Sequence, residues 1–189
     1  NPAVGIRVRC AEAHQAVLNK NEIEILLRQA KKKDHQFYPH WTLALLTGMR
    51  SGELYSLRWS DVDLVSGKIT ISKAWTRHNG EGPTKTAKNR IYPISSQCRK
   101  FLEELKAKSE TNSDFVLPHM WEWQQGEQAK ILKSFCEEIG ITPVKFHDLR
   151  ATFITQMLNN GVPLSKVMAI VGHSSLKTTQ GYLRLSGKD

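Results

Sequence analysis

The chain has 189 residues, with 27 Lys or Arg against 18 Asp or Glu, which gives a formal net charge of +9. This length fits one substantial domain with its own core and leaves little room for two. The positive charge favours a polyanionic partner, and nucleic acid is the commonest such partner of a basic domain.

Membrane and extracellular classes are not indicated. No apolar run approaches the roughly 18 residues of a membrane span, and the start "NPAVGIRVRC" has no signal-peptide core. Binding to a membrane surface would call for a basic amphipathic helix or a lipidation signal, and the termini show neither. The cysteines Cys10, Cys98 and Cys136 have no CxxC spacing, so neither a disulfide framework nor a zinc site is predicted. We expect an intracellular protein.

The first predicted helix follows an irregular N-terminal segment. Residues 1–19 suggest an arm or linker from an upstream domain, and 20–189 the domain itself. Asn21 and Glu24 resemble a capping box, and the helix should end near Lys33. Its apolar positions have helical spacing: Ile23, Leu26, Leu27 and Ala30.

A helix-to-helix corner is predicted around Arg50. The apolar run "FYPHWTLALLTG" should stop at Gly48, a typical C-terminal signal, and "RSGELYSLRWSDVD" restarts helically with Ser51 as the cap. Arg50 therefore lies between two helices.

The remaining elements predict an α+β fold that is mostly α-helical. The alternating "KITISKA" and the extended "TKTAKNRIYPIS" flank the turn "HNGEGP" and indicate a small antiparallel sheet. Helical patterns return in "SSQCRKFLEELKAK", "EQAKILKSFCEEIG", "FHDLRATFITQMLNNG" and "PLSKVMAIVG".

Polar residues in several of these elements form a candidate site. In "KFHDLRATF", His147 and Arg150 are three residues apart and share a helix face. In "TGMRSGEL", Glu53 is placed to hold Arg50 by a charge-assisted pair. Lys85 stands at the expected sheet turn. His173 and Tyr182 follow near the C-terminus.

This set of residues suits chemistry at a phosphodiester. Two guanidinium forks match the non-bridging oxygens that gather charge during attack. The phenol of Tyr182 needs a proton acceptor and a positive field to become a nucleophile, and His147 is the candidate acceptor. Lys85 would protonate the leaving 5′-oxygen, and His173 would donate a hydrogen bond to the phosphate. A two-metal site would need several carboxylates that converge on one point. The candidates do not form such a cluster, so the site is predicted to be metal-free. They are Glu53, Asp61, Asp63 and Asp148.

Five short segments in order resemble the tyrosine recombinases, the phage-integrase family of site-specific DNA recombinases: "TGMRSGEL", "TKT", "HDLR", "VGH" and "GY". The resemblance covers about residues 20–185, and it implies the catalytic-domain fold of that family. It also implies that Arg50 and Arg150 bind the phosphate and that Glu53 supports Arg50. Lys85 would be the hairpin lysine, and the two histidines would be His147 and His173. Tyr182 would be the nucleophile that forms a 3′-phosphotyrosyl bond, with no metal, ATP or other cofactor.

The resemblance further implies double-stranded DNA as the partner. It implies a homotetramer on DNA and a monomer in isolation, with accessory DNA-bending proteins as further partners and a cytoplasmic location on the nucleoid. No segment before residue 20 is long enough for the N-terminal domain usual in the family, so an excised catalytic domain is expected. Basic stretches suggest phosphate contacts at Lys31, Lys32, Lys33, Arg77, Lys88 and Arg90.

Two other classes stay open at this point. A type IB topoisomerase-like enzyme would use the same nucleophile to nick and reclose one strand. A non-catalytic regulator would keep the fold and the basic surface, and its DNA binding would survive Tyr182→Phe.

Overall fold

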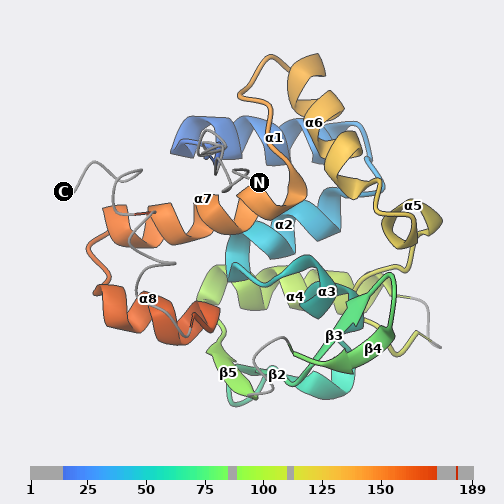
Figure 1. Ribbon diagram of the computed structural model, residues 1–189, viewed down its shortest axis with the longest axis vertical. Coiled ribbons are helices and arrows are strands. Elements are labelled where there is room, and N and C mark those ends of the chain that lie inside the picture. The colour runs from blue at the N-terminus through green and yellow to red at the C-terminus, as the bar shows by residue number, and fades with distance from the viewer. Residues whose placement is uncertain (1–14, 85–88, 110–112, 174–181, 183–189) are drawn as a thin grey trace, which may run out of the picture.

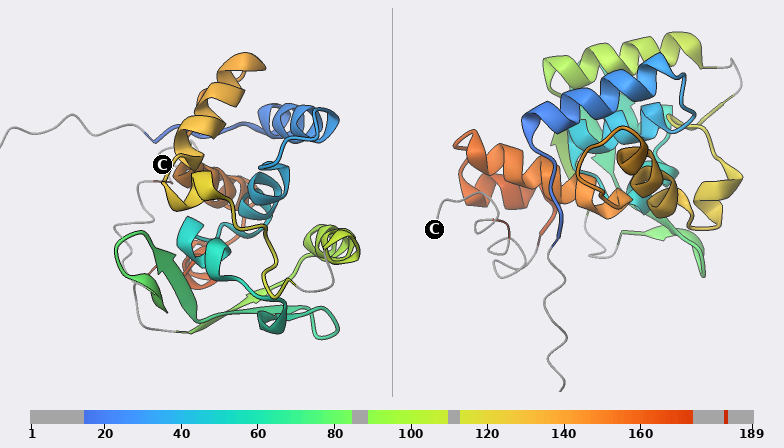
Figure 2. Two further views of the ribbon diagram at one scale, coloured as in Figure 1. Left: turned by 90° about the vertical axis from the view of Figure 1, so that its right-hand side faces the viewer. Right: turned by 90° about the horizontal axis from the view of Figure 1, so that it is seen from above.

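The computed structural model describes residues 15–84, 89–109, 113–173 and 182. Its helices are α1 (Lys20–Lys32), α2 (Tyr38–Thr47), α3 (Ser51–Ser56), α4 (Ser96–Lys108), α5 (Trp121–Gln124), α6 (Gln128–Glu138), α7 (Phe146–Asn159) and α8 (Leu164–Val171), with a 3₁₀ turn at Trp59–Asp61. The strands are β1 (Val62–Asp63), β2 (Lys68–Ile71), β3 (Lys73–Thr76), β4 (Gly80–Pro83) and β5 (Arg90–Pro93). The strands gather at one side of the molecule, opposite α1 and α6 (Figures 1 and 2). The prediction of a mostly helical α+β fold is confirmed.

The strands form two small antiparallel sheets, where the sequence pattern predicted one. The first has the order β1-β2-β5, with Ile69 opposite Tyr92, and the second pairs β3 with β4. The glycine-rich stretch expected to be only a turn supplies β4, which runs antiparallel to β3 beyond the tight turn at residues 77–79. Glycines carry no side-chain alternation, so periodicity gave no sign of this strand.

The start of α1 lies two residues earlier than predicted. Asn19 and Glu22, and not Asn21 and Glu24, form the capping box, with Asn19 Oδ1 accepting from Glu22 N at 3.0 Å and Glu22 Oε2 accepting from Asn19 N at 2.9 Å. Glu22 Oε1 also accepts from the backbone N–H of Thr142 at 3.0 Å. This tertiary contact favours the capping box that starts at Asn19. The two candidate capping boxes have the same spacing, so the local sequence pattern alone does not decide between them.

The corner between α2 and α3 forms where it was predicted. Gly48 ends α2 in the left-handed region at φ 62°, and its N–H donates to Ala44 O at 2.8 Å. The predicted cap of α3 is wrong, because Ser51 is already helical and Glu53 performs the capping: its Oε2 accepts from Arg50 N at 2.8 Å.

The main core forms around α2, which packs against α7 (Figure 1). Trp41 and Leu43 are fully buried there, together with Leu149 of α7. Cys98 and Cys136 are buried free thiols whose pKa is raised by that burial. None of the helices in the described ranges is long and apolar enough to cross a membrane.

Burial of His40 makes stability depend on pH. This ring on α2 is fully buried, its Nε2–H donates to Pro118 O at 3.0 Å, and burial lowers its pKa from 6.5 to about 4. Between these values the unfolded chain binds a proton that the folded chain does not, so stability falls as pH falls through that window. We expect His40→Gln to remove about 2 kcal/mol of the loss between pH 7 and pH 5.

Urea unfolding at pH 7 and pH 5 measures this difference. The control is His78→Gln, a change at an exposed position. An equal loss of stability on acidification in wild type and His40→Gln would contradict the prediction.

Candidate active site

Glu53 holds the corner residue Arg50 in place. The Glu53 side chain is buried, and its Oε1 accepts from Arg50 Nη1 at 2.9 Å. Because the same carboxylate caps α3 through the backbone N–H of Arg50, both ends of this arginine are fixed by one group. The side chain of Arg50 remains 26% exposed, so it stays accessible to a ligand from solvent.

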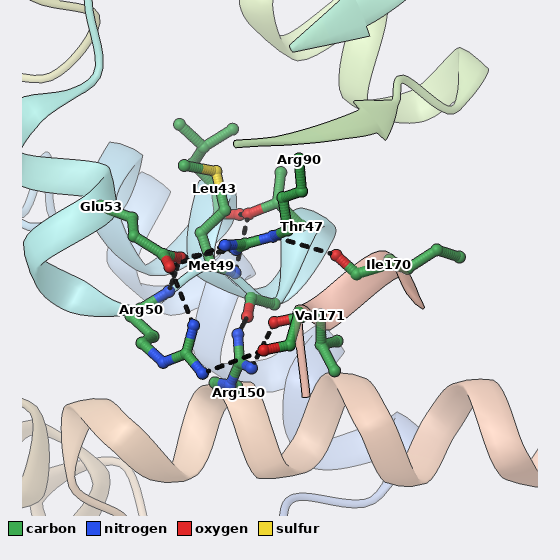
Figure 3. Close-up of polar contacts among 11 residues, drawn as sticks. Leu43, Thr47, Met49, Arg50, Glu53, Arg90, Arg150, Ile170 and Val171 are labelled. Atoms are coloured by element: carbon green, nitrogen blue, oxygen red, sulfur yellow. Dashed lines mark hydrogen bonds and ion pairs between the residues drawn. The ribbon is translucent and has the colours of Figure 1, made fainter. Parts of the chain in front are cut away.

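Arg90, at the start of β5, completes an ion-pair network around Glu53 (Figure 3). Its Nη1 and Nη2 donate to the two carboxylate oxygens at 2.8 and 2.6 Å, and its Nε donates to Ile170 O at 3.3 Å. The side chain is only 11% exposed. This placement differs from the prediction of a DNA contact, because the guanidinium faces the protein interior and is occupied there.

Arg150 lies on α7 and is the most deeply buried of the three arginines, at 2% exposure. Its Nη1 donates to Gly48 O at 2.5 Å and its Nη2 to Val171 O at 2.6 Å. Burial, and then the positive charge of Arg50, lower its pKa to about 10. The guanidinium therefore stays charged at neutral pH.

The three arginines meet at the C-terminal end of α8. Ile170 O accepts from Arg90, Val171 O from Arg150, and Gly172 O from Arg50 Nη2 at 3.4 Å. Carbonyls at a helix C-terminus lack helical partners and form the negative end of the helix dipole, so they favour cations. Figure 3 shows the guanidinium groups of Arg50 and Arg150 side by side above α7. The structure thus brings together two residues that are 100 positions apart in the chain.

Positive charge exceeds negative charge in this cluster. Burial by itself raises the pKa of Glu53, but the hydrogen bonds and charge of Arg90, with those of Arg50, outweigh it and lower that pKa. Glu53 is therefore ionised at neutral pH. Among the described residues, the Glu53 carboxylate is bonded to two guanidinium groups and a third, that of Arg150, adds further positive charge, so the cluster is suited to an added anion.

The two histidines are uncharged at neutral pH. His147 lies in the first turn of α7, where partial desolvation and the charge of Arg150 lower its pKa. His173 follows Gly172, and desolvation, then Arg150 and Arg50, lower its pKa to about 4. The charges of Arg150 and Arg50 thus act on both rings.

Tyr182 packs against α7, the helix that carries Arg150, and against α8. It is 6% exposed and belongs to a buried cluster with Ala151 and Val171. Its ring stacks on that of His173, with centroids 6.1 Å apart. Burial raises the pKa of the phenol, whereas the charge of Arg150 and a hydrogen bond with Gln15 act to lower it.

Comparison with known proteins agrees with this arrangement. The sequence pattern of the phage integrase family matches residues 16–188. The chain belongs to the phage integrase family. The resemblance carried by the five short segments is thereby confirmed.

Relatives of this integrase-family chain are integrases and recombinases. The chain is 28% identical over 158 residues to the ICEBs1 integrase of Bacillus subtilis (strain 168), covering 76% of this chain and 43% of the relative. It is 31% identical over 154 residues to the tyrosine recombinase XerC of Roseiflexus sp. (strain RS-1), covering 76% and 46%. The chain thus spans less than half the length of these relatives.

Solved structures show the same fold. The crystal structure of XerA recombinase superposes with a TM-score of 0.68 at 27% identity, over 92% of this chain and 60% of that one. The Tn1549 transposon integrase in complex with a circular intermediate DNA has a TM-score of 0.76 at 19% identity, over 89% and 61%. The catalytic domain of bacteriophage HP1 integrase gives 0.63 at 24%, over 90% and 88%. The predicted catalytic-domain fold of the family is confirmed.

Several predicted site residues lie elsewhere or outside the described part of this integrase-family chain. Lys85 and Lys88 fall outside the described residues. Lys31 and Lys32 are in the last turn of α1, and Lys33 pairs with Glu138 of α6, whereas the arginine cluster is built from α3, β5, α7 and α8. Arg77 is exposed, with a 3.4 Å bond from its Nη1 to Gln125 O. DNA contacts by these residues stay predictions.

Sequence reasoning missed the roles of Arg90, Gly172 and Gln15. In the sequence Arg90 stands in a run of basic residues, so no local pattern distinguishes it from a surface cation. The carboxylates weighed as metal ligands have local roles: Asp61 caps a 3₁₀ turn, Asp63 accepts from Ser66, and Asp148 caps α7. Over the described ranges, no group of three or more His, Cys, Asp or Glu is arranged to hold a metal ion.

Proposed function

We propose that this chain is the catalytic domain of a tyrosine site-specific recombinase, which cleaves and rejoins double-stranded DNA through a 3′-phosphotyrosyl intermediate. One observation carries the proposal. Arg50 and Arg150 donate to the adjacent carbonyls of Gly172 and Val171, and the phenol of Tyr182 lies within their field.

The arginines are assigned to the scissile phosphate. Arg150 is fixed by two carbonyls and Arg50 by Glu53, so neither needs to reorganise as negative charge grows on the non-bridging oxygens. Pre-oriented donors in a water-poor site stabilise such charge far more than donors in bulk water do. Neutral His173 is assigned a further hydrogen bond to the phosphate.

Tyr182 is assigned as the nucleophile and His147 as its proton acceptor. Burial raises the pKa of the phenol, so Tyr182 is protonated at neutral pH and must lose its proton during attack. The lowered pKa of His147 keeps its imidazole free to accept that proton. The phenolic oxygen forms a bond to phosphorus as the bond to the 5′-oxygen breaks, and Lys85 is assigned as the donor that protonates the leaving oxygen. Attack by a 5′-hydroxyl reverses these steps and needs no ATP.

The larger setting is also proposed. Solved relatives are described in complex with DNA, including the Tn1549 transposon integrase with transposon right end DNA. We extend the DNA partner to this chain, with a homotetramer on DNA, a monomer in isolation and accessory DNA-bending proteins in the full reaction. Residues 1–19 are assigned as the connection to an upstream domain, and the site of action as the cytoplasmic nucleoid.

A nicked suicide substrate tests the function. Because the fragment beyond the nick diffuses away after cleavage, the covalent intermediate cannot be resealed. We expect wild-type protein to form an adduct that survives denaturant, and Tyr182→Phe to bind the same DNA without forming one. Adduct formation by Tyr182→Phe would refute the assignment.

This reaction and a second assay on a closed circular, supercoiled plasmid separate the other two classes. DNA binding without any adduct in wild type would indicate a non-catalytic regulator. Supercoil relaxation without recombinant product, when two target sites are supplied, would indicate a topoisomerase-like enzyme.

A further inference from the structure

Each of the three guanidinium nitrogens of Arg90 donates to a protein group named above. Its guanidinium binds both oxygens of Glu53, and its Nε binds Ile170 O. Such a two-point fork fixes the direction of a carboxylate as well as its charge, which a single ammonium cannot do. Arg90 therefore sets the orientation of Glu53.

Arg50 is held by the same two parts of the structure that Arg90 binds, the Glu53 carboxylate and the C-terminal end of α8. Glu53 Oε1 accepts from Arg50 at 2.9 Å and from Arg90 at 2.8 Å. The second support of Arg50 is Gly172 O, two residues beyond the carbonyl that Arg90 holds. Movement of Arg90 would remove one hydrogen-bond partner from the Glu53 carboxylate and one from the end of α8, and both of these groups hold Arg50.

The stem of Arg90 also packs against the turn that precedes His173. Gly172 has φ 69°, and a Cβ at this position would lie 3.0 Å from Cδ and 3.2 Å from Nη1 of Arg90. This close approach suits glycine and few other residues. Through this contact β5, which begins at Arg90, packs against the turn at Gly172 that precedes His173.

We infer that Arg90 is a positioning residue for strand cleavage: it orients Glu53 and the C-terminal end of α8, and through them Arg50 and the His173 turn, without binding DNA itself. The inference rests on the proposed function. A buried ion pair gives little stability beyond that of an apolar replacement of similar volume. The test must therefore measure how Arg90 orients its neighbours, and not how much it stabilises the fold.

The test compares Arg90→Lys and Arg90→Met with wild type. At saturating nicked substrate, we expect adduct formation to slow by about ten- to a hundredfold in Arg90→Met. Arg90→Lys should lie between Arg90→Met and wild type, since it keeps the charge but loses the fork. The Kd for DNA and its salt dependence should stay as in wild type. Arg58→Ala, which removes a half-buried cation that is paired with Glu81 outside the cluster, is the control for lost charge.

A direct phosphate contact would behave differently. Loss of one such contact makes the negative slope of log K against log salt less steep by about 0.9. That result, or normal adduct formation in both variants, would overturn the inference.

A second readout does not depend on activity. The Glu53 carboxyl is titrated by carbon NMR, and its pKa should rise in Arg90→Met because the bond and charge that lower it are lost. An unchanged titration would overturn the inference. If wild-type protein forms no adduct, the proposed function fails, and this titration still decides whether Arg90 controls Glu53.

Discussion

Replacing Arg150 with alanine lowers the rate of adduct formation on the suicide substrate by about a hundredfold or more. Removal of one preorganised charge-stabilising donor raises a barrier by about 3 kcal/mol, and Arg150 is such a donor because two backbone carbonyls hold its guanidinium. DNA binding should weaken far less, because many phosphate contacts share it. The measurement is the single-turnover rate at saturating DNA.

Two further variants test whether a slow rate in Arg150→Ala reflects loss of the guanidinium or loss of the fold. Arg150→Lys keeps the positive charge and can still donate to Gly48 O or Val171 O, so its rate should fall between those of wild type and Arg150→Ala. Arg58→Ala removes an arginine that lies outside the cluster, with its guanidinium 4.3 Å from the ring centroid of Phe115. A rate for Arg150→Ala within about threefold of that of Arg58→Ala would contradict the assignment.

Replacing Glu53 with glutamine lowers the free energy of unfolding by about 3 to 5 kcal/mol. The change leaves Arg50 and Arg90 facing each other across a neutral amide, and removal of one partner from a buried ion pair is strongly destabilising. It also removes the N-terminal charge that caps α3. Urea denaturation at pH 7 measures the effect.

Glu81→Gln is the matched control. Glu81 also pairs with two cations, Arg58 at 3.4 Å and Lys73 at 3.3 Å, but at the surface. Exposed pairs of this kind contribute about 1 kcal/mol or less. Equal destabilisation by the two changes would show that burial of the Glu53 network has no special energetic role.

Local signals predicted the helix-to-helix corner well. Gly48 marks a helix end by its freedom to adopt a positive φ, and the three-residue spacing of Arg50 and Glu53 allows the observed pair. The shared face of His147 and Arg150 follows from helical geometry in the same way. These features depend on residues within one turn of one another, so the sequence pattern is sufficient to predict them.

Long-range features were beyond such patterns. The inward position of Arg90 is set by Glu53, 37 residues earlier, and by Ile170, 80 residues later. Similarly, Asn19 is chosen over Asn21 because Thr142 binds Glu22 from the segment before α7. Tertiary contacts of this kind decide between local alternatives of nearly equal energy.

The chain has four tyrosines, and we propose only one of them, Tyr182, as the nucleophile. Tyr92 donates its hydroxyl to Leu46 O at 2.6 Å, and the Tyr55 hydroxyl accepts from Gln124 at 2.8 Å. Tyr182 is coupled electrostatically to Arg150 and Arg50. We therefore propose Tyr182, rather than Tyr55 or Tyr92, as the group that attacks a phosphate held by the arginines.

Mass-spectrometric mapping of the DNA-linked peptide tests this claim most directly. Wild-type protein is trapped on the suicide substrate and digested, and the peptide that carries the nucleotide is sequenced. We predict a phosphodiester link between the 3′ end of the cleaved strand and Tyr182. Attachment to any other residue, or to a 5′ end, would contradict the account.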